Sequence, residues 1–339
     1  MNPKVQRDKS EHPITHYKIN SISPVYANIC SFFQISQDNF YNFKLKYGNR
    51  DKYTIIDLIG NGKYSDVFFG HCRRGWCAIK VLKSVDFWKV QRELYILDRL
   101  KNFDHIIHVL DVVRDPDSDI ISIVTEFCPN SDWKTLYPQL SMDEIRYYMY
   151  YLLQTLDHVH SKGIMHRDIK PLNFLIDKKH NKCCLIDFGL ADHYIPYKQY
   201  TVRCATMRYK SPELLLNYHF YDYSLDIWGA GCIFAEMLIR PIFIKGNTTL
   251  EVLESVCKIW GKQVFLDYIN KYGMDLLPEL DQVVKSTTND TSSWEDIFNE
   301  MRPNFRSLAA FDLLKKMLTV DHGERITARD ALKHPFFSG

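Results

Sequence analysis

The sequence of 339 residues contains no apolar run long enough to span a bilayer, because its most apolar stretch, 227–239, includes Glu236. It contains no Cys-x-x-Cys pair among its nine cysteines, and an odd number of thiols without such a pair is typical of free cysteines in a reducing compartment. The start of the chain lacks the apolar core of a secretory signal. We therefore expect an intracellular protein, in the cytoplasm, the nucleus or both, with no membrane partner.

The sequence also lacks an excess of either positive or negative charge. Lysine and arginine (43) nearly balance aspartate and glutamate (41), which gives a formal net charge of +2 at pH 7. No global attraction to nucleic acid is expected from that balance, so we predict no nucleic-acid partner. The apolar share of 46% and the charged share of 25% are ordinary for a globular protein, and the length predicts one large domain or two joined ones.

The order of sequence patterns divides the chain into three parts. Residues 1–40 are polar and without clear periodicity, which predicts a loosely held N-terminal extension. Residues 41–128 predict a small lobe. Its apolar runs at 53–59, 67–71 and 76–82, separated by glycine-containing turns, indicate an antiparallel sheet. A helix over 86–100 and two further strands near 107–113 and 120–127 complete this lobe.

Residues 129–339 predict a larger, mainly helical lobe that begins after a break at Pro129. Ser141 and Glu144 form a capping box at the start of a long helix. Further helices are expected at 228–237, 250–260, 308–318 and the C-terminal end, with a polar loop over 285–293. The predicted fold class is therefore α+β, with a small antiparallel-sheet lobe that carries one main helix, a larger helical lobe and a cleft between them.

A glycine-containing turn joins the first two strands. Gly60 and Gly62 let the backbone approach phosphate oxygens, although Ser65 stands at the third glycine of G-x-G-x-x-G and a plain hairpin turn would use the same residues. Lys80 on the third strand and Glu93 on the inward helix face each need an opposite charge, so we expect them to pair. In the alternative, both side chains extend into solvent.

The segment 166–173 sets an acid, a cation and an amide at fixed spacing where Pro171 prevents regular helix. Asp187 ends a later strand with a carboxylate at its tip. Asp187 and Asn173 offer the hard oxygen ligands that Mg²⁺ prefers, which leaves Asp168 to accept a proton from a substrate hydroxyl. The segment alone is equally compatible with a surface turn. The ordered set of glycine turn, lysine, glutamate and acidic loop is not.

This ordered set resembles the signature of the eukaryotic protein kinases. Ser211-Pro212-Glu213 stands where that family has Ala-Pro-Glu, and Arg325 stands where it has the ion-pair partner of the glutamate. Among the kinases, the stretches GNGKYSDVF, GIMHRDIKP, LIDFGLADHYIP and YDYSLDIWGAGC resemble the catalytic subunits of casein kinase II. The resemblance extends from Tyr53 to nearly the end of the chain. It implies a serine/threonine kinase that transfers the γ-phosphate of ATP, with Mg²⁺, to proteins.

The resemblance also implies a role for each matching residue. Asp168 would be the catalytic base, Lys170 would contact the transferred phosphate, and Thr206 would favour serine or threonine acceptors. Lys80 and Glu93 would form the phosphate clamp. The metal ligands would be Asn173 and Asp187. The residues implied for nucleotide binding are Ile59, Gly60, Asn61, Gly62, Lys63, Tyr64, Ser65, Val67, Ala78, Lys80, Glu126, Cys128, Leu175 and Ile186.

Departures from the casein kinase II pattern concern the substrate. Where that family has a lysine cluster that reads acidic sites, this chain has Asp86-Phe87-Trp88 and retains only Lys89. Arg203 and Lys210 keep two basic positions of the substrate-reading segment, so both are candidate substrate-binding residues. With fewer cations we expect a weakened preference for acidic sites. A kinase of the cyclin-dependent or mitogen-activated group with another substrate rule stays open, as does a pseudokinase scaffold.

The resemblance has two further implications. A regulatory, beta-type subunit would bind through Ile55 and Phe68. Residues 40–53 resemble the stretch that, in the casein kinase II subunits, packs on the activation segment and holds the active state. We therefore expect activity without phosphorylation of that segment, although it contains Tyr200, Thr201 and Thr206.

Overall fold

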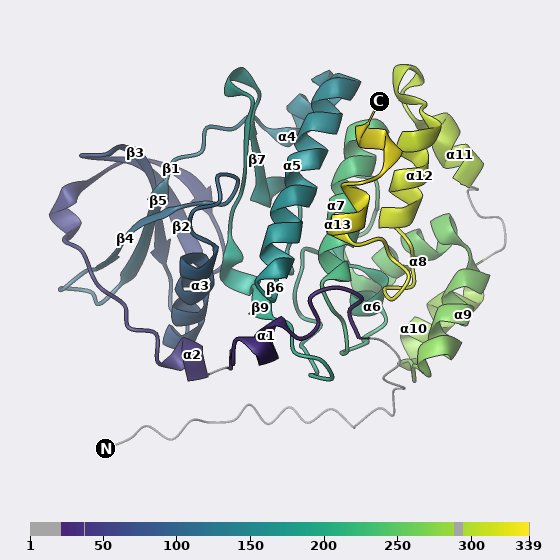
Figure 1. Ribbon diagram of the computed structural model, residues 1–339, viewed down its shortest axis with the longest axis horizontal. Helices are drawn as coiled ribbons and strands as arrows, with labels where there is room; N and C mark the ends of the chain where they lie inside the picture. Colours follow the sequence, from purple (N-terminus) through teal and green to yellow (C-terminus); the bar gives the residue numbers. More distant parts are fainter. Residues whose placement is uncertain (1–21, 37, 288–293, 339) are drawn as a thin grey trace.

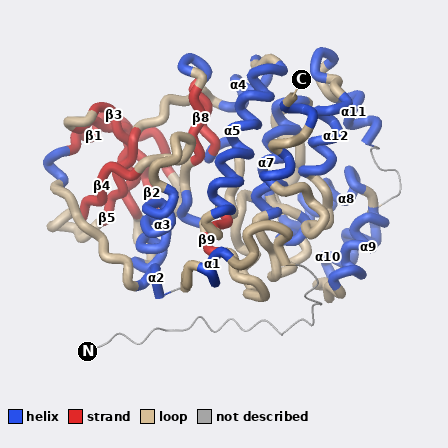
Figure 2. Tube along the Cα trace, viewed as in Figure 1, coloured by secondary structure: helices blue, strands red, loops and turns tan. Residues whose placement is uncertain are grey.

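The computed structural model describes residues 22–36, 38–287 and 294–338, which fold into two lobes (Figure 1). The smaller lobe is a five-stranded antiparallel sheet in the order β1-β2-β3-β5-β4, with helix α3 beside it. Its elements are β1 Tyr53–Asn61, β2 Ser65–Cys72, β3 Gly75–Leu82, α3 Phe87–Leu100, β4 Val109–Arg114 and β5 Ile121–Glu126. Figure 2 shows strands concentrated in this lobe and helices in the other, which confirms the predicted fold class.

The first hairpin differs in one detail from the prediction. Strand β1 continues through Gly60 to Asn61, which pair with Val67 and Asp66 on β2. The turn itself is closed by Gly62, whose N–H donates to the carbonyl of Ser65 at 2.9 Å. Most of the glycine segment is therefore strand, and the free backbone is confined to the tip.

The larger lobe is mainly helical. Its helices are α4 Trp133–Leu136, α5 Met142–Ser161, α6 Pro212–Leu215, α7 Ser224–Leu238, α8 Thr249–Trp260, α9 Lys262–Tyr272, α10 Pro278–Ser286, α11 Trp294–Glu300, α12 Leu308–Met317 and α13 Ala328–Ala331. Two small hairpins complete it, formed by β6 Ile164–Met165 with β9 Asp192–His193 and by β7 Phe174–Asp177 with β8 Lys182–Leu185. None of the helices in the described ranges is long and apolar enough to cross a membrane.

The centre of this lobe is the contact between α5 and α7. The predicted capping box is present at the start of α5, where the Ser141 hydroxyl accepts the Glu144 N–H and the Glu144 carboxylate accepts the Ser141 N–H. Every residue of α7 is buried, as its almost wholly apolar sequence from Trp228 onward predicts, so this helix is a rigid support for the loop at 166–173.

Helices α9, α10 and α11 were not predicted. Each of these helices buries only a few residues. In α9 the buried residues are Phe265, Tyr268 and Tyr272, of which two are tyrosine. Such sets of residues give weak periodic patterns because tyrosine also occurs at exposed positions. The predicted polar loop begins inside α10 at Lys285, and residues 288–293 lie outside the described part of the chain.

The described part of the N-terminal extension is docked on the body, so the expectation of a loosely held tail is wrong for 22–36 and 38–40. Two short helices lie there, α1 Ile29–Phe32 and α2 Asp38–Tyr41 (Figure 1). The Tyr26 hydroxyl donates to Asp157 on α5 at 2.7 Å, and buried Phe40 packs between Tyr95 of α3 and His193. These anchors are isolated along the sequence, and so they leave no periodic pattern. Residues 1–21 and 37 lie outside the described ranges.

Candidate active site

A buried carboxylate at the start of α7 holds the loop at 166–173 in place. Asp226 accepts the backbone N–H groups of His166 and Arg167, both at 2.8 Å, and its Oδ2 lies 3.0 Å from the His160 ring. Burial alone would raise the pKa of Asp226, but these hydrogen bonds and the neighbouring histidines lower it overall. The Arg167 backbone has a φ of +67°, a conformation that the anchored N–H groups stabilise.

Four donors surround the carboxylate of Asp168. Its Oδ1 accepts the N–H and the hydroxyl of Thr206, each at 2.8 Å, while its Oδ2 accepts Lys170 Nζ at 2.7 Å and Asn173 Nδ2 at 3.1 Å. The structure thus brings together four of the predicted site residues. Lys170 Nζ also donates to the Thr206 hydroxyl at 2.8 Å, so the Asp168 carboxylate, the Lys170 ammonium and the Thr206 hydroxyl form one closed network.

Lys80 connects the two lobes. Its Nζ donates to Glu93 Oε1 at 2.8 Å and to Asp187 Oδ1 at 2.9 Å, and the Lys80 and Glu93 side chains are only 22% and 10% exposed. The alternative in which both extend into solvent is therefore wrong. Burial lowers the pKa of Lys80, but the two carboxylates outweigh it and raise the pKa above its usual value. In turn, the charge of Lys80 holds the pKa of Asp187 down to about 2.

The donor set at Asp187 and Asn173 fits a magnesium ion. Because its pKa is about 2, Asp187 is ionised at neutral pH. The amide nitrogen of Asn173 is used in bonds to the carbonyl and the carboxylate of Asp168, so the amide oxygen is the remaining ligand atom. A carboxylate and an amide oxygen, completed by phosphate oxygens and water, are the hard ligands that Mg²⁺ takes.

The predicted nucleotide-binding residues lie around the glycine turn and the segment that joins the lobes. Val67 pairs with Lys80, and Ala78 pairs with Thr125 across the sheet. Lys83 Nζ donates to the Gly62 carbonyl at 2.8 Å, which steadies the turn. Strand β1 carries the predicted residues Ile59, Gly60 and Asn61, and the turn and β2 carry Lys63, Tyr64 and Ser65. Glu126 ends β5, and Cys128 lies in the segment that follows it. In the large lobe, β7 carries Leu175, and Ile186 follows β8. Their contacts with a nucleotide stay predictions.

The activation segment, residues 187–213, ends at a buried ion pair. Arg325 Nη1 and Nη2 each donate to a Glu213 oxygen at 2.9 Å, and both side chains are 0% exposed. This confirms Arg325 as the partner that the resemblance implied. The two candidate substrate residues differ: Arg203 is exposed, whereas half-buried Lys210 donates to the Val202 carbonyl at 3.2 Å.

Sequence reasoning missed Asp226 and Asp192. Asp226 gave a usable signal, since a carboxylate inside an apolar helix requires buried donors. Asp192 gave none. It lies 3.5 Å from Arg167 Nη2, 3.8 Å from Lys198 Nζ and 3.9 Å from Arg92 Nη1, and these cations come from three separate segments.

The Asp168 carboxylate with its lysine, the Lys80 that bridges two carboxylates, and the oxygen-bearing Asp187 and Asn173 are therefore assembled where the lobes meet. The family model described as the protein kinase domain matches residues 53–337, which is most of the chain. Proteins with this domain use ATP and Mg²⁺, and the donor set formed by Asp187 and Asn173 fits the metal ion. By this match and the geometry of its site, the chain belongs to the protein kinase family, whose members are phosphotransferases that act on protein substrates.

Proposed function

We propose that the protein is a serine/threonine kinase of the casein kinase II type. The observation that carries this proposal is the contact of Thr206 with Asp168. The Thr206 hydroxyl and N–H donate to Asp168 Oδ1, and the same hydroxyl accepts Lys170. The activation segment thereby places a small side chain directly at the base, beside the space that an acceptor hydroxyl must enter. A short aliphatic alcohol suits such a site better than the longer phenol of tyrosine.

The chain's own residues would act by positioning and by neutralising charge. Asp168 accepts the proton of the acceptor hydroxyl, and Lys170 compensates the negative charge that spreads over the transferred group. Lys80, oriented by Glu93, holds the phosphates. Mg²⁺, held by Asp187 and Asn173, supplies further charge neutralisation when it is bound.

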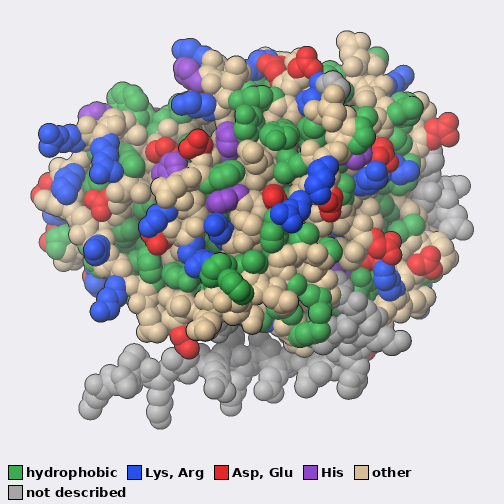
Figure 3. Space-filling view, in the orientation of Figure 1, with side chains coloured by type: hydrophobic (Ala, Val, Ile, Leu, Met, Phe, Trp, Pro, Cys, Tyr) green, Lys and Arg blue, Asp and Glu red, His purple; other side chains and the backbone are tan. Residues whose placement is uncertain are grey.

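The surface around the start of α3 supports a weakened preference for acidic substrates. Lys89, the retained lysine, is paired with Asp86 at 2.7 Å, and the Trp88 ring packs near Tyr41 at 6.4 Å. On the face shown in Figure 3, lysine and arginine side chains stand in separate groups interspersed with acidic ones rather than in one continuous patch.

A peptide library tests which residue accepts the phosphate and how the charge of the neighbouring residues affects kcat/KM. We expect phosphoserine and phosphothreonine but no phosphotyrosine, with only a modest gain in kcat/KM when acidic residues surround the acceptor. Asp86→Lys is expected to raise the acidic-to-neutral ratio about two- to fivefold, since exposed charges are worth up to about 1 kcal/mol. Asp143→Lys on α5, remote from this surface, is the matched control. Tyrosine phosphorylation, or an equal rise in the control, contradicts the proposal.

The activation segment supports activity without phosphorylation. Asp192 already supplies the anion between Arg92, Arg167 and Lys198. Buried Tyr200 anchors the segment, because its hydroxyl accepts the Ile195 N–H at 2.6 Å and donates to the His193 carbonyl at 2.9 Å. These contacts need no added phosphate.

Protein shown by intact mass spectrometry to be unphosphorylated is therefore expected to be fully active. Phosphatase treatment should leave kcat unchanged. An unmodified enzyme that is inactive until a kinase phosphorylates Tyr200, Thr201 or Thr206 would contradict this expectation.

We further propose a regulatory subunit on the small lobe. Ile55 on β1 is 54% exposed and Phe68 on β2 is half-buried, so both offer apolar surface to a partner. Size-exclusion chromatography with a casein kinase II regulatory subunit should show a complex that Ile55→Glu weakens. Co-elution unaffected by Ile55→Glu, or no co-elution at all, counts against this surface.

A further inference from the structure

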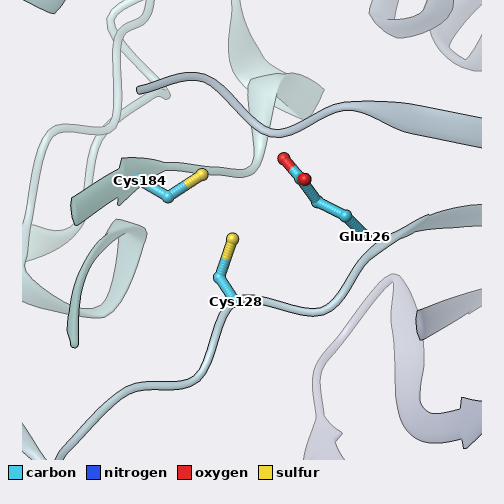
Figure 4. A group of neighbouring side chains, drawn as sticks. All are labelled: Glu126, Cys128 and Cys184. Carbon is cyan, nitrogen blue, oxygen red and sulfur yellow. The ribbon is translucent and has the colours of Figure 1, made fainter. Parts of the chain in front are cut away.

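Two thiols and a carboxylate meet where the strand β5 passes into the segment between the lobes. Glu126 is the last residue of β5, Cys128 follows two residues later, and Cys184 lies on β8 of the large lobe. Their ligand atoms, one from each residue, all lie within 4.8 Å of one another. Figure 4 shows both sulfur atoms and the carboxylate directed toward the same space.

The carboxylate is held in place by its surroundings. Glu126 Oε1 accepts the backbone N–H of His108 at 3.1 Å and lies 3.0 Å from His108 Nδ1. The backbone N–H of Glu126 donates to the His108 carbonyl at 3.1 Å, so both residues are fixed to each other. Carboxylates that bind metals are typically hydrogen-bonded in this way by a neighbouring group, which fixes the orientation of the ligand.

The cluster is accessible from solvent. A cavity of about 650 Å³ is lined by Glu126, Cys128 and Cys184, together with His108 and Leu175. An ion can therefore reach the three ligand atoms without opening the protein core. Leu175, Glu126 and Cys128 line this cavity and also belong to the predicted nucleotide-binding residues, so the cluster borders the predicted adenine site.

The chemistry of the ligand atoms selects the kind of ion. Thiolates disfavour the hard ions Mg²⁺ and Ca²⁺, whereas Zn²⁺ takes sulfur at about 2.3 Å and carboxylate oxygen at about 2.0–2.2 Å in tetrahedral sites. We propose that Glu126, Cys128 and Cys184 bind one zinc ion, with water in the fourth position. Closing the three atoms around the ion requires side-chain movements of about 1 Å, since they now lie within 4.8 Å of one another and tetrahedral ligands at these distances lie about 3.5–3.8 Å apart.

Zinc binding to this cluster is coupled to the release of the two thiol protons. Without an ion the Cys184 thiol donates to the carbonyl of Leu185 at 3.8 Å. When zinc binds, each thiol releases its proton to solvent, two Zn–S bonds and one Zn–O bond form, and no electrons are transferred.

The ion would join the connecting segment to the β7–β8 hairpin. This hairpin already holds the small lobe through Leu185, which donates its N–H to the His105 carbonyl at 2.8 Å and accepts the Ile107 N–H at 3.1 Å. A zinc ion at Cys184 adds a further link beside these two. The inference rests on the ligand geometry and does not require the proposed acceptor specificity.

Metal titration of the reduced, metal-free full chain tests the site. One equivalent of added Zn²⁺ should bind per chain. It should raise Tm, because an ion that binds only the folded state stabilises that state. Co²⁺ in its place should give the visible bands of a tetrahedral ion together with a sulfur-to-metal charge-transfer band. Cys184→Ala and Cys128→Ala are each expected to lose the charge-transfer intensity and the zinc-dependent rise in Tm.

Cys183→Ala is the matched control, because Cys183 lines the same cavity but its sulfur lies 3.6 Å from His105 Nδ1 and is not one of the three clustered ligand atoms. It should bind zinc as the unmodified chain does. If Cys184→Ala fails to fold, Glu126→Gln provides the same readout, with weakened binding expected. Absence of a thiolate spectrum in the unmodified chain, an unchanged spectrum in both Cys184→Ala and Glu126→Gln, or equal loss in Cys183→Ala would each overturn the assignment.

Discussion

The variant Asp168→Asn is expected to lower kcat by about 10²–10⁴-fold, the range that a positioned general base supplies, without weakening the binding of Mg-ATP. Asparagine has nearly the same shape and keeps an oxygen for the Thr206 N–H, which donates to Asp168 Oδ1 at 2.8 Å. It removes the negative charge that Lys170 faces at 2.7 Å and the basicity that the acceptor hydroxyl needs. The measurement combines γ-phosphate incorporation into a serine peptide with equilibrium ATP binding.

The matched control for this variant is Asp281→Asn, the same change at a partly exposed residue of α10, which should leave kcat unchanged. Wild-type kcat in Asp168→Asn would exclude Asp168 as the base. Loss of ATP binding in parallel with kcat would mean that Asp168 supports the nucleotide site instead, and the assigned role would again be wrong.

The variant Arg325→Met is expected to destabilise the protein by about 3–5 kcal/mol, because it leaves the Glu213 carboxylate buried without its partner. Arg325 also donates to the carbonyls of Thr319, Ser224 and Val320, at 2.9, 2.8 and 3.1 Å, so the loss reaches two separate backbone segments. Thermal unfolding should show a fall in Tm of about 5–10 °C.

Two comparisons separate this effect from a general loss of charge. The double variant Glu213→Leu/Arg325→Met should recover part of the lost stability, because no charge is then left unpaired in the interior. Lys258→Met breaks the pair with Glu254, in which both side chains are about half exposed, and should change stability by less than about 1 kcal/mol. Equal shifts in Tm for Arg325→Met and Lys258→Met would contradict the account.

The residues that sequence could place are those whose chemistry demanded a partner. The sequence pattern predicts that Lys80 and Glu93 are both buried, and a buried charge needs an opposite charge. In the structure, Lys80 Nζ lies 2.8 Å from Glu93 Oε1. Asp168 and Asn173 are five positions apart in one loop, so their contact is local. Sequence periodicity likewise predicted α5 and α7, whose apolar faces are continuous.

The features that sequence could not place depend on contacts between distant segments. Asp192 gathers cations from α3, the loop at 166–173 and the activation segment, and no local pattern marks that meeting. The docked N-terminal segment depends on single anchors such as Phe40. The absence of Cys-x-x-Cys was equally uninformative about Cys128 and Cys184, because that spacing detects only thiols that are neighbours along the chain.

The most direct test of the central claim is a single-turnover measurement with the unphosphorylated chain in excess over γ-labelled ATP, Mg²⁺ and a serine peptide. Transfer of the label to the peptide hydroxyl, dependent on Mg²⁺ and abolished in Asp168→Asn, is the predicted result. Binding of Mg-ATP without transfer to any serine or threonine peptide above the Asp168→Asn background would contradict it, and would make the protein a scaffold that only binds nucleotide.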